Sequence, residues 1–346
     1  MYKHKHTSTS TRVIFRTKLV VFVSSADCDS SDRTHRTDLF RYTYKVSALF
    51  FQFAMTTEES LSLSKTSHNE VTLSLAKKES AEHIGKEMEE VYATMRNKRL
   101  VVRAVPIDQE VFSGIRVDSK KLTVVKTVHF IRHGQGFHNF CADMFSADGK
   151  EWEQFVRSPN NPYTMSEVLD APLTEKGRLQ AHQLNSVTSA WPAEKQPELV
   201  VLSPNCRALQ TGLIVFGHLL SKESNVKFVA HEMVRETHGV HLCDKRRSVT
   251  RAKVEFSNVD FSLITDDEDM LFEDDRRESK MEIGNRVYDF FEWLYTKEEN
   301  NIAVASHSGW LMSVFNGVCD CHGFPELREW FHTGEMRSVK LIFEEQ

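Results

Sequence analysis

From residue 122 to residue 346 the chain alternates short apolar runs with amphipathic segments of helical period. Residues 123–131 are predicted to form a buried strand, and Thr174 is predicted to cap a helix that ends near residue 191. Further strands are predicted at 198–202, 227–234, 302–306 and 338–343, and further helices at 206–220, 281–295 and 309–315. Such alternation is typical of a mainly parallel sheet with helices on both faces. We therefore predict an α/β fold, specifically a three-layer αβα sandwich.

The first 55 residues differ in composition from the rest. They contain nine lysines and arginines against four aspartates, and no acidic residue precedes Asp27, whereas the whole chain carries a net charge of -5. This composition resembles an organellar transit peptide, and it equally fits a disordered tail or an over-extended start before Met55. Residues 1–76 are thus predicted to be a low-order extension and linker.

The remaining chain divides in two. Between residues 77 and 121 we predict an appended helix and a connector, because apolar residues recur at helical spacing in this segment: Ile84, Met88, Val91 and Met95. The main domain is predicted to span residues 122–346.

Composition excludes several classes of protein. The 346 residues are 40% hydrophobic and 27% charged, which fits a soluble globular protein rather than a collagen-like or strongly disordered chain. No apolar run approaches the roughly 18–20 residues that span a bilayer, so we expect no membrane association. The six irregularly spaced cysteines favour a reducing compartment. A cytoplasmic location is predicted, with the mitochondrion or plastid as the alternative if the N-terminal segment is a transit peptide.

Polar residues gather where predicted strands end. In parallel sheets, ligands bind beyond the carboxyl ends of the strands. Four strands are followed there by Arg132-His133-Gly134, by Ser203-Pro204 with Arg207 one helical turn on, by Arg235-Glu236, and by Ser306-His307-Ser308-Gly309. Two histidines, a glutamate and at least two arginines are therefore predicted to meet at one edge of the sheet.

These residue types together suit phosphoryl transfer. Guanidinium groups and helix N-terminal amides bind a dianionic phosphate. A neutral imidazole among them can attack phosphorus and form a phosphohistidine. The carboxyl group of Glu236 can protonate the leaving alkoxide and then activate water.

The ordered set resembles the histidine phosphatase (phosphoglycerate mutase-like) superfamily over residues 123–346. Residues 235–247 are similar to a plant and fungal branch described as phosphoglycerate mutase-like. The resemblance implies a phosphorylated nucleophile at His133 and a proton donor at Glu236. It implies that the rest of the phosphate pocket consists of Arg132, Arg207 and His307, with Asn139 helping to bind the transferred phosphate.

The chain also departs from the glycolytic mutases of this family. Those enzymes continue Arg-His-Gly with Glu-Ser and a Trp-Asn pair, whereas this chain reads Gln135-Gly136-Phe137-His138-Asn139. The departure favours hydrolysis, so we predict a metal-independent phosphomonoesterase that needs no cofactor and acts on a small phosphorylated metabolite. A phosphoglycerate or sugar-phosphate mutase, a catalytically weak phospho-ligand binding protein and a zinc hydrolase are the alternatives.

A basic run follows the segment that carries Glu236. Its members are Lys245, Arg246, Arg247, Arg251 and Lys253. The run is interpreted either as a solvated face or as the site of a second anionic group of the substrate, and Arg246 is the residue expected to contact substrate. Seven acidic residues between 266 and 275 are predicted to form a solvated loop or to pair with this run.

Two groups of potential metal ligands have irregular spacing and are interpreted as ordinary packing rather than zinc sites. They are His238, His241 and Cys243, and Cys319, Cys321 and His322. The chain has neither a glycine-rich dinucleotide fingerprint nor a P-loop, and no motif supports nucleic-acid binding.

Overall fold

The computed structural model describes residues 85–110, 114–118, 121–147, 161–221 and 224–346. The predicted low-order extension, residues 1–76, lies outside this range. Within these ranges no helix is both long enough and apolar enough to cross a membrane.

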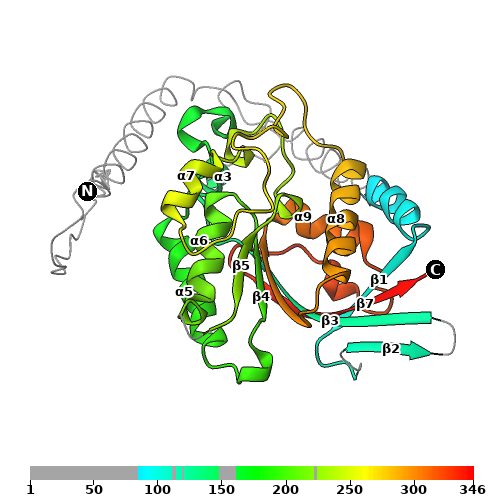
Figure 1. The fold of residues 1–346 in the computed structure, drawn as a ribbon. Helices are drawn as coiled ribbons and strands as arrows, with labels where there is room; N and C mark the ends of the chain where they lie inside the picture. Colours follow the sequence, from blue (N-terminus) through cyan, green and yellow to red (C-terminus); the bar gives the residue numbers. More distant parts are fainter. Residues whose placement is uncertain (1–84, 111–113, 119–120, 148–160, 222–223) are drawn as a thin grey trace, which may run out of the picture. The chain divides into compact units, whose positions relative to one another are not determined.

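Seven strands of the described residues form one sheet in the order β1-β7-β3-β6-β4-β5, with β2 paired to β3 (Figure 1). The strands are β1 (Leu100–Pro106), β2 (Gly114–Asp118), β3 (Lys121–Arg132), β4 (Leu199–Leu202), β5 (Lys227–Ala230), β6 (Asn301–Ser306) and β7 (Met336–Glu345). Neighbours in the series β3, β6, β4 and β5 are parallel. Strand β7 runs antiparallel between β1 and β3, and β2 is antiparallel to β3.

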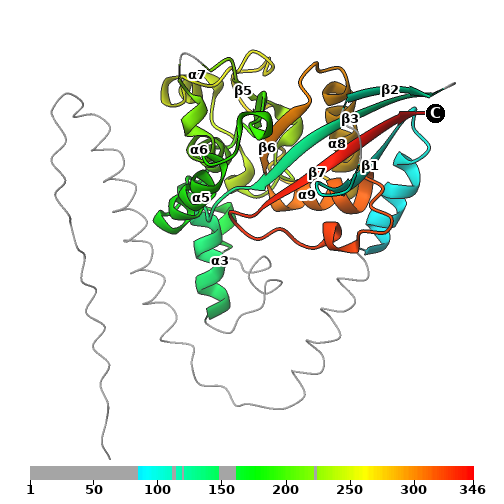
Figure 2. The ribbon, with the colours of Figure 1, turned by 90° about the horizontal axis from the view of Figure 1, so that it is seen from below.

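Helices cover both faces of the sheet, as Figures 1 and 2 show. One face packs on α5 (Glu175–Thr188), α6 (Cys206–Val215) and α7 (Val249–Glu255). The other face packs on α8 (Lys280–Tyr295), α9 (Ser308–Ser313) and the helix of residues 85–95. The predicted three-layer αβα sandwich is confirmed.

Several element boundaries differ from the prediction. The strand predicted at 227–234 ends at Ala230, because His231 Nδ1 accepts the backbone N–H of Met233 and begins a 3-10 helix over Glu232–Val234. The helix predicted at 206–220 ends at Val215 and is followed by a separate 3-10 turn. The helix predicted at 309–315 is α9, which continues as a π-helix over Val314–Val318.

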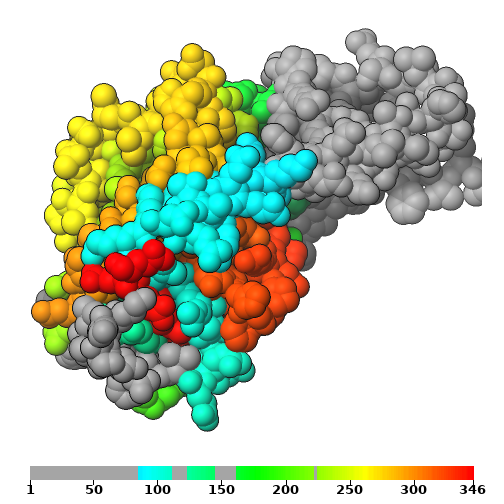
Figure 3. Space-filling model, turned by 90° about the vertical axis from the view of Figure 1, so that its right-hand side faces the viewer, coloured from blue at the N-terminus to red at the C-terminus, as the bar shows by residue number. Residues whose placement is uncertain are grey.

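The segment predicted to be a helix and connector contributes to the same core as the main domain. Strands β1 and β2 lie in it, and neither was predicted. Val91 and Met95 of the preceding helix belong to the core cluster on the α8 face. A Cβ atom on Gly284 would lie only 2.5 Å from Val91 Cγ1, so the helix lies against α8. In Figure 3 this cyan helix lies across the surface beside α8 and the C-terminal strand.

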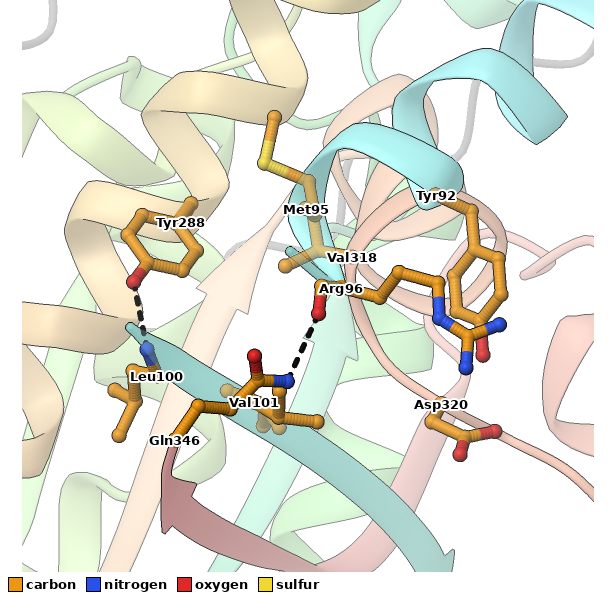
Figure 4. A pocket seen from close by; sticks show the side chains of 10 residues that line it. Tyr92, Met95, Arg96, Leu100, Val101, Tyr288, Val318, Asp320 and Gln346 are labelled. Atoms are coloured by element: carbon orange, nitrogen blue, oxygen red, sulfur yellow. Dashed lines mark hydrogen bonds between the residues drawn. The ribbon is translucent and has the colours of Figure 1, made fainter. Parts of the chain in front are cut away.

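A small cavity of about 60 Å³ lies between this helix, β1 and the C-terminus (Figure 4). Next to it, the backbone N–H of Leu100 donates to Tyr288 Oη at 3.0 Å, and Gln346 Nε2 donates to the carbonyl of Arg96 at 3.0 Å. Glu344 pairs with Thr123 near the start of β3. The cavity is therefore at the opposite end of the sheet from the carboxyl end of β3.

Buried His129 predicts a pH dependence of stability. Its Nδ1 bonds Ser338 Oγ at 2.7 Å and its Nε2 bonds Asn301 Oδ1 at 2.9 Å. Burial lowers the pKa of His129 to about 4. Below the ordinary histidine pKa of about 6.5, the unfolded chain binds a proton at this residue that the folded chain does not. The contribution of His129 to stability should therefore fall by about 1.4 kcal/mol per pH unit until its folded pKa is reached.

Urea unfolding at pH 7 and pH 5 checks this expectation. His129→Gln should lose less stability between the two pH values than the wild type, although the variant starts from a lower value. His322→Gln, at an exposed histidine, should behave as wild type. Equal acid sensitivity of His129→Gln and wild type would contradict the assignment.

Candidate active site

The carboxyl ends of three parallel strands bring the predicted residues together. Arg132 is the last residue of β3 and His133 follows it, while Ser306 is the last residue of β6 and His307 follows it. The backbone N–H of His133 donates to the carbonyl of Ser306 at 3.0 Å. Ser203, directly after β4, bonds His307 Nε2 through its hydroxyl at 2.7 Å. The two histidines therefore lie side by side, with ring centroids 5.0 Å apart.

The imidazole of His133 is only 1% exposed. Its Nδ1 lies 2.7 Å from the carbonyl oxygen of Gly134, which assigns the ring hydrogen to Nδ1 and leaves a lone pair on Nε2. Arg207 Nε donates to that Nε2 at 3.1 Å. Burial, followed by the charges of Arg207 and Arg132, holds the pKa of His133 well below its usual value. The ring is thus neutral, and an anion bound by Arg207 would lie against Nε2.

A buried carboxylate orients Arg207. Arg207 Nη1 donates to the carbonyl of Cys243, and Nη2 donates to Asp244 Oδ1 at 2.8 Å. The other oxygen of Asp244 pairs with Arg277 Nη1 at 2.8 Å. Burial opposes ionisation of Asp244, yet Arg277 and Arg207 together hold the pKa of this carboxyl below its usual value. Asp244 and Arg277 were not predicted as site residues, and their sequence neighbourhood alone does not reveal this pairing.

Three buried nitrogen atoms around His133 carry no hydrogen bond to any described residue. They are Arg132 Nε, His138 Nδ1 and His307 Nδ1. The ring of His138 lies 5.6 Å from that of His133. Buried polar atoms without partners are uncommon because each costs free energy. An anion with several oxygen atoms is the kind of ligand that can bond all three.

The carboxylate of Glu236 lies at the N-terminus of α9. Its Oε1 accepts the backbone N–H of Thr237 at 2.9 Å, and its Oε2 accepts the N–H of Gly309 at 3.2 Å and the hydroxyl of Ser308 at 3.3 Å. A Cβ atom on Gly309 would lie 2.4 Å from Oε1, so a larger residue would displace the carboxylate. Glu236 is therefore held beside His307, because its hydrogen-bond partners Ser308 and Gly309 are the next two residues in the chain.

The turn after His133 is pressed against the start of α5. A Cβ atom on Gly134 would lie 2.3 Å from the carbonyl oxygen of Gly177, and one on Gly177 would lie 2.2 Å from the carbonyl oxygen of Gln135. Thr174, the N-cap of α5, donates its backbone N–H to the same Gln135 oxygen at 2.9 Å. Both glycines are required by this close backbone contact.

Asn139 lies in the first turn of α3 (Phe137–Ala147), beside the same turn. Its Oδ1 accepts the backbone N–H of Gly136 at 3.0 Å. Its predicted role in phosphate binding stays a prediction.

Arg246 is not brought to the other site residues. Its side chain is almost completely buried, and its guanidinium bonds Glu232 at 2.6 Å and four backbone carbonyls. These carbonyls belong to Arg247, Asp266, Asp267 and Glu268. All five N–H donors are used, so the guanidinium has none left for substrate. The structure instead gives Arg246 a role in holding the acidic segment 266–275 in place.

The potential metal ligands noted in the sequence have other contacts. His238 Nε2 lies 3.4 Å from Glu278 Oε1. The ring of His241 packs edge-on against that of Tyr163, with the ring centroids 5.3 Å apart. Among the described residues, no group of three or more His, Cys, Asp or Glu side chains is placed to hold a metal ion.

A comparison with protein families matches residues 128–339 to the model described as "Histidine phosphatase superfamily (branch 1)". The match covers more than half of the chain and includes every residue of the site described above. The chain belongs to the histidine phosphatase superfamily.

Relatives of this histidine phosphatase family member are named after phosphoglycerate mutase. An Arabidopsis thaliana protein named "phosphoglycerate mutase-like protein" is 32% identical over 243 residues, which cover 63% of this chain and 84% of that protein. "Probable phosphoglycerate mutase PMU1" of Saccharomyces cerevisiae is 27% identical over 217 residues, covering 56% of this chain and 72% of that protein. Among solved structures, a mycobacterial glucosyl-3-phosphoglycerate phosphatase aligns at 15% identity with a TM-score of 0.37, covering 62% of this chain and 90% of that one.

Proposed function

We propose that this chain is a phosphomonoesterase that hydrolyses a small phosphorylated metabolite through a phosphohistidine at His133. The observation that carries the proposal is the neutral, buried imidazole of His133, bonded by Arg207 and surrounded by three unpartnered nitrogen atoms. A neutral imidazole whose unprotonated Nε2 faces arginine donors is what phosphoryl transfer to nitrogen needs.

The first step forms the phosphoenzyme. The Nε2 lone pair of His133 attacks phosphorus in line with the ester oxygen, the N–P bond forms and the P–O ester bond breaks. The departing alkoxide takes a proton from the carboxyl group of Glu236. Arg132 and Arg207 stabilise the charge on the equatorial oxygens throughout.

The second step returns the enzyme to its starting state. Water attacks phosphorus while the carboxylate of Glu236 accepts its proton, the N–P bond breaks and inorganic phosphate leaves. Neither step calls for a metal ion, because the arginines supply the positive charge.

The test is phosphate release from a panel of phosphomonoesters in the presence of a chelator. The panel includes 3-phosphoglycerate with and without 2,3-bisphosphoglycerate. Release that survives chelation supports the proposal, and release abolished by chelation contradicts it. Primed isomerisation of 3-phosphoglycerate without net release would identify a mutase instead.

Glu236→Gln should slow the reaction most for poor leaving groups. A general acid contributes about 10²–10⁴-fold, so alkyl phosphates should lose about that factor. Nitrophenyl phosphate should lose much less in the first step, because its leaving group needs no proton. Single-turnover rates on both substrates measure this difference, with Glu298→Gln, at an exposed glutamate, as the control. Equal losses on the two substrates would contradict the proton-donor role.

A further inference from the structure

His138 has no part in the two steps above, yet it lies in the same pocket. It stands in the first turn of α3 and is 5% exposed. We propose that His138 is a further catalytic residue, whose Nδ1–H donates a hydrogen bond to an oxygen of the transferring phosphoryl group. This inference rests on the proposed function, since it assigns a contact within the same anion pocket.

The contacts of the ring place Nδ1 on the side of the nucleophile. A Cβ atom on Gly136 would lie 2.7 Å from His138 Nδ1 and 3.4 Å from Arg207 Cδ. The Nδ1 edge therefore faces the turn that follows His133, close to the side chain of Arg207. That side chain in turn donates to His133 Nε2 at 3.1 Å. We therefore expect an oxygen of a phosphoryl group bound to Nε2 to come within reach of His138 Nδ1.

Two core histidines show what a purely structural imidazole looks like in this protein. Both ring nitrogens of His129 are hydrogen-bonded, and His231 Nδ1 accepts a backbone N–H. His138 Nδ1, although equally buried, bonds none of the described residues. An unpartnered buried polar atom costs about 1–3 kcal/mol, and an apolar ring of the same size would avoid that cost. Ligand binding gives the nitrogen the partner that the protein does not supply.

The surroundings favour an anion as that partner. His138 is flanked by Arg207 of α6, by Arg132 and His133 at the end of β3, and by His241. The ring of Tyr163 packs edge-on against it at 5.5 Å and fixes its orientation. Asp244 neutralises part of the charge of Arg207, while the two guanidinium groups and the other rings still present several N–H donors that a phosphate dianion could accept.

The experiment compares His138→Phe with His138→Gln. Phenylalanine keeps the aromatic packing and removes the donor, whereas glutamine keeps an N–H donor and loses the ring. A phosphate contact predicts that His138→Phe weakens binding of inorganic phosphate about tenfold or more and that His138→Gln recovers part of it. If His138 only packs, His138→Phe should instead bind phosphate more tightly than His138→Gln. Titration calorimetry with inorganic phosphate measures the affinities, and circular dichroism checks the fold of each variant.

His241→Phe and His241→Gln form the matched control pair, because that ring also packs edge-on against Tyr163 and has an ordinary polar neighbour in Asp244. Both should bind phosphate within about threefold of wild type. Wild-type affinity in His138→Phe, or weaker binding by His138→Gln than by His138→Phe, would overturn the inference while leaving the proposed function intact. A wild type that binds phosphate without turnover contradicts only the proposed function. A wild type that neither binds nor releases phosphate contradicts both.

Discussion

A His133→Ala variant is expected to release phosphate from its best substrate at least about 10⁴-fold more slowly than wild type, because the reaction loses its nucleophile. Folding should be retained, since the described side-chain bonds of His133 go only to Gly134 and Arg207. Phosphate-release assays measure the rate, and thermal unfolding checks the fold. Substantial turnover by a folded variant would exclude a covalent role for His133.

Intact-mass analysis after a rapid quench supplies a second readout. Wild type mixed with substrate should carry one phosphoryl group for a short time, and His133→Ala should carry none. His322→Ala, at an exposed histidine, should label as wild type does. Equal labelling of His133→Ala and wild type would show that another residue accepts the phosphoryl group.

Arg207→Gln should lose both activity and stability. The substitution removes the proposed phosphate ligand, the donor to His133 and one partner of the buried Asp244. Breaking a buried ion pair costs about 3–5 kcal/mol, although Arg277 remains beside Asp244 and lessens the effect. Urea unfolding and phosphate release measure the two losses separately.

A second substitution separates the two effects. Arg207→Gln combined with Asp244→Asn should regain part of the lost stability, because the uncompensated carboxylate is gone. It should not regain phosphate release, because the guanidinium is still missing. Activity restored in the double variant would show that Arg207 acts only by neutralising Asp244.

The sheet could be predicted largely because its parallel strands are apolar runs separated by helices. Each polar motif directly follows such a strand, so strand ends alone predicted the neighbourhood of His133 and His307. Strand β1 was missed because a charged residue, Arg103, interrupts its apolar pattern. Its partner β7 lies more than 200 residues further along the chain, and no local pattern marks this pairing.

The contacts of individual arginines could not be predicted from the sequence. The five residues of the basic run look alike in sequence, yet Arg246 turns inward because backbone carbonyls of residues 266–268 are placed to accept its donors. Every residue has a backbone carbonyl, so the sequence does not show which of them will face a given side chain. The same holds for the shared carboxylate of Asp244, whose two partners come from separate segments of the chain.

The contact between Gly134 and Gly177 has a consequence for how the enzyme meets its substrate. Two backbones this close leave the turn of His133 no room to move toward α5 when no ligand is bound. The donors around the imidazole are therefore preorganised, and little of the binding free energy is consumed in ordering them. The turn that carries His133 should therefore need no slow rearrangement when substrate binds.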